Sequence, residues 1–178
     1  WQSDLDFWEQ EVVQYPTPYA KVSLALIQYN HGDIENALPG FYEGLTEEPP
    51  YVEGDGCMSF VSSVLSLEGA QSALDASDWA ISKGCVKDGK MMGLRAVLLA
   101  GLGRWNEVNG IVLDDWNDPT RRLDVVRTVV FAREERWSEF CHEWDDWSDQ
   151  DRLLQQLQVL SPSQFANTDW IKTTCTVK

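Results

Sequence analysis

The feature that most constrains this chain is an internal repeat with a period near 34 residues. Four segments share a turn followed by the expected start of a helix, and they recur at intervals of 37, 34 and 32 residues, counted from Gly32, Gly69, Gly103 and Glu135. Repeats of this length are typical of a helix-turn-helix unit that stacks on copies of itself. The sequence therefore predicts an all-α fold, an α-solenoid of stacked antiparallel helix pairs.

Apolar residues are spaced as one face of a helix requires. Val22, Leu26 and Tyr29 form one such stripe, and Leu123 and Val126 begin another. A single helix pair cannot bury its stripe, so copies must stack to form a core. We expect helices over residues 3–15, 17–30, 33–46, 57–67, 70–83, 87–101, 104–115, 119–134, 137–146 and 150–160, and a shorter one over 164–172.

The unit over residues 20–50 resembles a tetratricopeptide repeat along its whole length. In that family, small residues lie where the two helices of a unit touch, an aromatic side chain follows in the second helix, and a proline closes the unit. The matching residues here are Ala25, Ala37, Phe41 and Pro49. The other three units follow the pattern more loosely. The resemblance implies a superhelix built from such helix pairs.

The resemblance also divides the chain. It implies a single repeat domain over residues 1–178, in which a half repeat or cap covers 1–16, four repeats cover 17–50, 51–85, 86–118 and 119–149, and a C-terminal capping helix and tail cover 150–178. The first helix lacks a partner helix. Its apolar stripe, which includes Phe7 and Val12, predicts a surface for self-association.

A binding surface follows from the same resemblance. In the family, the first helix of each pair lines the concave side of the stack, and peptides bind there. The corresponding groove positions here are Tyr19, Val22, Leu26, Tyr29, Asn30, Ser59, Ser63, Ser66, Lys90, Val97, Arg122, Val125, Val129 and Arg133. The clamp that some members use for chaperone tails is missing, because Val22 and Leu26 stand at its positions in the first unit. We predict a non-catalytic protein–protein interaction module or scaffold that binds a peptide or partner domain in the groove.

The charge balance argues against nucleic acid as a partner. The chain has 14 Lys and Arg against 29 Asp and Glu, a net charge of −15, whereas nucleic-acid binding needs a surface that neutralises phosphates. Five arginines nevertheless gather between residues 121 and 136. Either they pair with acids of the same chain, or an anionic segment of a partner docks on them.

No sequence pattern supports a catalytic or metal site. The chain has two histidines, and the helical metal-binding spacing Glu-x-x-His occurs once, at Glu139 and His142. A nucleophile elbow, a phosphate-binding loop and a Cys-x-x-Cys motif are absent from the sequence. We therefore expect no enzymatic activity, no metal and no cofactor.

The alternative hypothesis is an all-helical enzyme or carbohydrate-binding domain that uses the tryptophans and the acidic clusters. Nine tryptophans favour stacking on sugars, and acids are adjacent at 114–115 and 145–146. Adjacent helical residues point about 100° apart and do not converge on one substrate atom. Several tryptophans recur at equivalent repeat positions, which favours packing in the core.

The four cysteines bear on the compartment. In a stacked arrangement the pairs Cys57 with Cys85 and Cys141 with Cys175 could form disulfides, while buried reduced thiols are the alternative. Disulfides would fit an oxidising compartment, so we favour an extracytoplasmic location, such as the periplasmic part of a membrane-anchored protein, over the cytoplasm. No apolar run reaches the roughly 20 residues that span a bilayer, so we expect no membrane insertion by this chain. The chain begins at Trp1, so a preceding leader, anchor or domain is left open.

Overall fold

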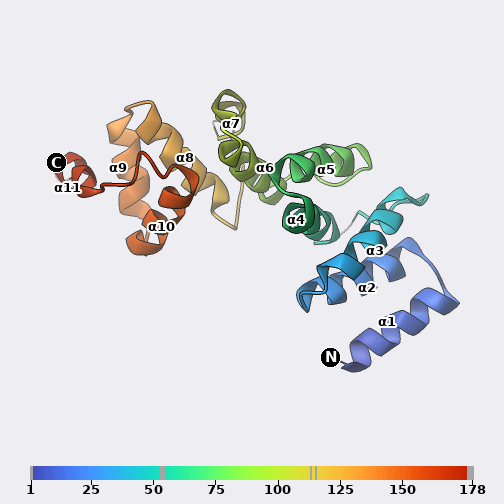
Figure 1. Ribbon diagram of the computed structural model, residues 1–178. Helices are drawn as coiled ribbons and strands as arrows, with labels where there is room; N and C mark the ends of the chain where they lie inside the picture. The colour runs from blue at the N-terminus through green and yellow to red at the C-terminus, as the bar shows by residue number, and fades with distance from the viewer. Residues whose placement is uncertain (1, 53–54, 113, 115, 176–178) are drawn as a thin grey trace. The chain divides into compact units, whose positions relative to one another are not determined.

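The computed structural model describes residues 2–52, 55–112, 114 and 116–175, and within these ranges the chain forms helices and no strand (Figure 1). The helices are α1 (Gln2–Gln14), α2 (Pro18–Asn30), α3 (Ile34–Thr46), α4 (Gly56–Glu68), α5 (Ala70–Ser82), α6 (Gly89–Gly101), α7 (Trp105–Val112), α8 (Arg122–Arg133), α9 (Trp137–Asp146), α10 (Gln150–Leu160) and α11 (Asp169–Cys175). They belong to two compact units, residues 1–87 and 88–178. Each predicted repeat contains one helix pair, and the predicted boundary after residue 85 lies two residues before the division between the units.

The predicted all-α fold is confirmed over the described residues. Helices that follow one another pack together from α1 to α5 and from α6 to α9, whereas α10 packs on α8 and α6, and α11 packs on α9. Two helices begin three or more residues later than expected. The helix α8 begins at Arg122 rather than at 119, because the carboxylate of Asp118 accepts hydrogen bonds from the backbone N–H groups of Thr120 and Leu123, both at 2.9 Å. The helix α11 begins at Asp169 rather than at 164, where the side chain of Asn167 accepts the N–H of Asp169 at 2.9 Å.

In the first unit, α2 and α3 pack closely because small residues stand between them. Ala25 and Ala37 are fully buried. A Cβ atom added at Gly44 would collide with the side chain of Val22 and would lie 2.9 Å from the backbone carbonyl oxygen of Pro18. The two helices can therefore approach this closely only with glycine at that position.

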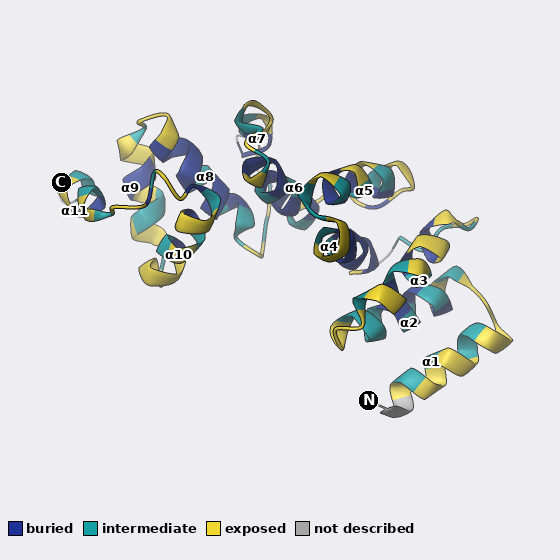
Figure 2. Cartoon of the chain, viewed as in Figure 1, coloured by how far each residue is buried: buried dark blue, intermediate teal, exposed yellow. Residues whose placement is uncertain are grey.

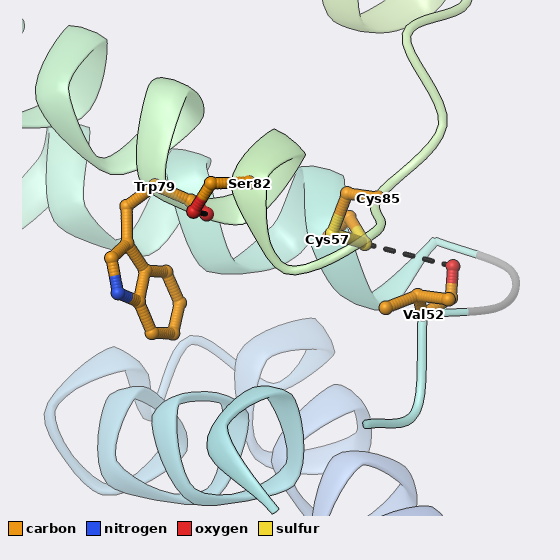
Figure 3. Close-up of a disulfide and its surroundings, with 5 residues drawn as sticks. All are labelled: Val52, Cys57, Trp79, Ser82 and Cys85. Carbon is orange, nitrogen blue, oxygen red and sulfur yellow. Dashed lines mark hydrogen bonds between the residues drawn. A yellow bond between two sulfur atoms is a disulfide. The ribbon is translucent and has the colours of Figure 1, made fainter. Parts of the chain in front are cut away.

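A disulfide between Cys57 and Cys85 joins the start of α4 to the segment that follows α5, with a Cα–Cα distance of 6.1 Å (Figure 3). The carbonyl oxygen of Val52 lies 3.6 Å from the sulfur of Cys57. On α5, Trp79 points away from the disulfide (Figure 3) and stacks on Tyr42 of α3, with ring centroids 5.1 Å apart. The first of the two cysteine pairs considered from the sequence is thus confirmed.

In the second unit, α8 lies at the centre and packs against α6, α7, α9 and α10. Most residues of α6 and α8 are buried, as the dark blue of these two helices in Figure 2 shows. A Cβ atom at Gly93 of α6 would lie 3.2 Å from the Cβ atom of Arg122, so the two helices come close at the start of α8. This contact fixes the position from which the Arg122 side chain extends.

An aromatic cluster closes the second unit around Phe140 of α9. The rings of Phe165 and Trp170 lie 6.4 Å and 5.2 Å from it, measured between centroids. A disulfide between Cys141 and Cys175, with a Cα–Cα distance of 5.2 Å, holds α11 against α9. The second cysteine pair is confirmed as well, and it brings the last helix into the core of the unit.

Candidate functional site

The candidate site is a hollow of about 440 Å³ in the second unit, bounded by α6, α8 and α10. It is lined by Val97 of α6, by Thr120, Arg122 and Val125 at the start of α8, and by Gln155, Gln156, Val159 and Leu160 of α10. Half of these side chains are aliphatic and half can form hydrogen bonds. Arg122 is the one lining residue that carries a charge. Such a mixture suits a ligand with both an apolar and a polar part.

The helix α10 contributes half of the lining because of its apolar spacing. Leu153 and Leu157 lie four residues apart, are fully buried and form part of the core cluster that includes Val125 and Val129 of α8. Side chains four residues apart share one face of a helix. Burial of these two leucines therefore fixes the rotation of α10 about its own axis. Gln156 and Val159 then fall on the flank of α10 that faces the hollow.

Arg122 is half-buried, lines the hollow and forms no ion pair with the residues that the structure describes. Its Nη1 atom is buried, and within the described part of the chain it has no hydrogen-bond partner. The carboxylate of Asp118 lies near the start of the same helix, but its oxygens accept hydrogen bonds from Thr120 and Leu123. A buried donor that bonds neither to protein nor to water costs about 1–3 kcal/mol, and more when it is charged.

The neighbouring arginines differ from Arg122 because each forms an ion pair or stacks on an aromatic ring. Arg121 pairs with Asp124 at 2.9 Å, and its guanidinium lies over the Trp147 ring at 4.2 Å. Arg133 lies over the Trp105 ring at 4.4 Å. The remaining two form ion pairs, Arg127 with Asp124 and Glu143, and Arg136 with Glu134 and Glu139. Internal pairing with acids of the same chain, one of the two alternatives above, therefore holds for Arg121, Arg127 and Arg136.

A second unsatisfied group lies in the same hollow. The side-chain oxygen Oε1 of Gln156 is buried and accepts no hydrogen bond from the described residues. Arg122 offers a donor and Gln156 an acceptor, yet the two do not bond to each other. A ligand that accepts from the guanidinium and donates to the amide would satisfy both groups.

The structure brings three of the fourteen predicted groove residues together at this hollow, namely Val97, Arg122 and Val125. Four others are buried: Val22, Ser59, Ser63 and Val129. Ser63 donates its hydroxyl to the carbonyl of Ser59 at 2.8 Å. These four side chains help to pack the helices and present little surface to a partner.

The remaining predicted groove positions lie elsewhere on the two units. Tyr19 is half-exposed, with its ring edge-on to Trp8 at 5.3 Å, and Tyr29 lies edge-on to Phe41 at 6.3 Å. Asn30 and Ser66 are exposed, while Leu26 and Lys90 are half-buried. Arg133 is exposed and stacks on Trp105.

The sequence analysis assigns α10 to a C-terminal cap and therefore misses its four lining residues, Gln155, Gln156, Val159 and Leu160. A signal for them does exist in the sequence. Arg152-Leu153 stands 30 residues after Arg122-Leu123, close to the repeat period, and Leu123 and Leu153 are both buried in the core. This spacing is the signal that aligns α10 with α8 and could have pointed to its side of the hollow.

Glu143 of α9 is a half-buried acid that pairs with one of these arginines. Its carboxylate lies 3.5 Å from Nη1 of Arg127. Burial raises the pKa of Glu143, and the charge of Arg127 opposes that effect only in part. Glu143 does not line the hollow, so the pair serves the contact between α8 and α9.

Most tryptophan rings of the described residues pack against other rings or cations. Trp144 stacks on Phe140 at 6.1 Å, and Trp137, which is 38 % exposed, meets Trp170 edge-on at 5.3 Å. Over the described ranges, the structure contains no group of three or more His, Cys, Asp or Glu side chains that could hold a metal ion. The helices described are all too short or too polar to cross a membrane.

Comparison of the chain with protein-family models, with curated proteins and with solved structures found no match.

Proposed function

We propose that this chain is a non-catalytic protein-interaction module of tetratricopeptide-like helix pairs, and that the hollow between α6, α8 and α10 binds a peptide segment of a partner protein. The observation that carries the proposal is the hollow itself. The helices α6, α8 and α10 bound it, and its volume of about 440 Å³ lies in the range of ligand-binding clefts. Concave surfaces of stacked helix pairs are suited to extended peptides.

The chemistry of the lining supports binding rather than catalysis. The eight residues are valines, a leucine, a threonine, two glutamines and an arginine. The lining contains no His, Asp, Glu, Cys, Lys or Tyr, the side chains that general acid–base catalysis ordinarily uses. The same side chains offer the aliphatic contacts and the hydrogen bonds that peptide recognition uses.

The two disulfides support an extracytoplasmic location for the module. Disulfides persist in oxidising compartments and are rare where thioredoxin and glutathione keep thiols reduced. Both pairs in this chain lie within one unit each and link segments that are 28 and 34 residues apart. The partner would then be another protein of the same compartment.

Selection of a random peptide library on the purified, oxidised chain tests the proposal. We expect the selected peptides to bind the chain when remeasured by fluorescence anisotropy. Val159→Arg, which places a long charged side chain at the edge of the hollow, should weaken that binding by about tenfold or more. Val159 is 79 % exposed, so this change should not disturb the core.

Val13→Arg in α1 is the matched control, because Val13 is 82 % exposed and belongs to the other unit. It makes the same change in charge and size away from the hollow. Peptide binding that survives Val159→Arg, or a library from which no peptide is enriched, would contradict the proposed function.

A further inference from the structure

We propose that the hollow between α6, α8 and α10 selects an acidic side chain, Asp or Glu, next to an aliphatic residue in the partner's peptide. This inference rests on the proposed function and specifies the chemistry of the segment that binds. The carboxylate contacts the guanidinium of Arg122, and the aliphatic side chain contacts Val97, Val125 and Val159. The main chain between them donates an N–H group to Gln156.

The charge of Arg122 is the first step of the argument. It is the single charged group on the lining, and no Asp or Glu is among the eight lining residues to repel a carboxylate there. Within the described ranges, the guanidinium forms no ion pair, and its Nη1 atom forms no hydrogen bond. A carboxylate matches the planar fork of a guanidinium with two parallel hydrogen bonds.

The position of Arg122 is fixed before any ligand arrives. The stem of its side chain starts 3.2 Å from the place where a Cβ atom of Gly93 would be, so α6 and α8 are in direct contact there. Asp118 holds the start of α8 through its hydrogen bonds to Thr120 and Leu123. The fold therefore fixes the backbone from which the guanidinium reaches the hollow, and this part of the site loses little conformational entropy when a ligand binds.

The rest of the lining specifies what lies beside the carboxylate. Val97 and Val125 come from α6 and α8, and Val159 and Leu160 come from α10, so the hollow that Arg122 lines also has aliphatic surface from all three helices. Gln156 contributes a buried oxygen without a donor. A backbone N–H of a peptide is the group that satisfies such an oxygen without adding a charge. A free anion would leave both the aliphatic surface and the amide unused.

The test uses three peptide libraries on the full oxidised chain. Each library contains decapeptides with acetylated and amidated ends, so that terminal charges play no part, and each has a fixed central pair: Glu-Leu, Gln-Leu or Lys-Leu. We expect the chain to retain Glu-Leu peptides about tenfold more than Gln-Leu peptides, and Lys-Leu peptides least. Equal retention of the three libraries would overturn the inference.

Variants assign the selectivity to one side chain. With Arg122→Gln, the ratio of Glu-Leu to Gln-Leu retention should fall to about one, whereas Arg133→Gln, the same change at the other end of α8, should keep the ratio. A ratio that persists in Arg122→Gln would overturn the inference. If circular dichroism shows that this variant does not fold, Arg122→Met replaces it, because methionine keeps an aliphatic side chain without the charge. The ratio of Glu-Leu to Gln-Leu retention on the unmodified chain tests the inference independently of either variant.

The same data separate the two proposals. Peptides that bind regardless of their charge and are lost with Val159→Arg leave the proposed function intact and overturn only the inference about the carboxylate. A chain that retains no peptide of any library overturns both.

Discussion

Replacing Gln156 with leucine is expected to stabilise the second unit. Among the described residues, the buried oxygen of Gln156 has no hydrogen-bond partner, which costs about 1–3 kcal/mol in the folded state. Leucine is similar in size to glutamine, has a similar helix propensity and would contact the aliphatic lining of the hollow. Part of the gain is lost, because Gln156 is only half-buried and its amide nitrogen gives up contact with water. The net expectation is a rise of about 1 kcal/mol in the free energy of unfolding.

Urea unfolding of the oxidised protein, followed by tryptophan fluorescence and by circular dichroism, measures this change. Gln155→Leu is the control, since Gln155 lies beside Gln156 in the sequence but is exposed, and its substitution should change the free energy of unfolding by no more than about 0.5 kcal/mol. The dependence of that energy on urea concentration should stay the same. A Gln156→Leu protein that is no more stable than Gln155→Leu would refute the reasoning, because it would mean that the oxygen has a partner in solution. Peptide binding should weaken in the same variant, so stability and binding are expected to change in opposite directions.

Three further predictions concern the framework around the site. Replacing both Cys141 and Cys175 by serine should lower the free energy of unfolding by about 3.5–4 kcal/mol, the loop-closure value for a separation of 34 residues. Differential scanning calorimetry measures this loss, and a decrease below about 1 kcal/mol would contradict the prediction. Burial raises the pKa of Glu143 in the folded state, so the folded protein binds this proton more tightly than the unfolded chain does. The stability that this group contributes is therefore present at low pH and is lost as the pH rises from about 4.5 through the folded pKa. In urea unfolding, the unmodified chain should gain stability relative to Glu143→Gln between pH 7 and pH 4, and a constant difference would contradict this prediction. Gly44→Ala should destabilise the first unit by about 1–3 kcal/mol in thermal unfolding. The control Gly110→Ala, with no atom within 4 Å of the added carbon, should be neutral or stabilising. Equal effects of the two substitutions would contradict the prediction, because they would show that the contact at Gly44 relaxes.

The helices were predictable because their apolar residues follow the helical period and because turn residues separate them. The spacing of Val22 and Leu26 and the small residues Ala25 and Ala37 are local patterns, and they suffice to place α2 and α3 within one residue of their observed bounds. The cysteine pairs were foreseen as one of two options, since the repeat period alone brings the helix ends together. Whether the thiols are close enough to bond depends on packing that sequence spacing does not contain.

The site was only partly predictable, because it depends on which side chains meet across helices. Arg122 and Arg133 look alike in the sequence. Arg133 stacks on Trp105, 28 residues before it, whereas the Nη1 atom of Arg122 has no hydrogen-bond partner among the described residues. Similarly, Val125 and Val129 are four residues apart on one face of α8 and both belong to the core cluster, yet only Val125 lines the hollow, whereas Val129 is fully buried. Such differences arise from packing between segments that are distant in the sequence.

The bond between Cys141 and Cys175 also determines how this protein responds to mechanical load. Tension applied to the chain beyond Cys175 passes directly through the sulfur atoms to α9, because the two residues are covalently joined. The segment between them, which contains α10 and most of α11, is bypassed and cannot be pulled out while the bond is intact. Since α10 supplies half of the lining of the hollow, a ligand bound there is shielded from a force on the C-terminal side. Under load, the first helix to yield from this end would be α9, and reduction of the bond would transfer that role to α11.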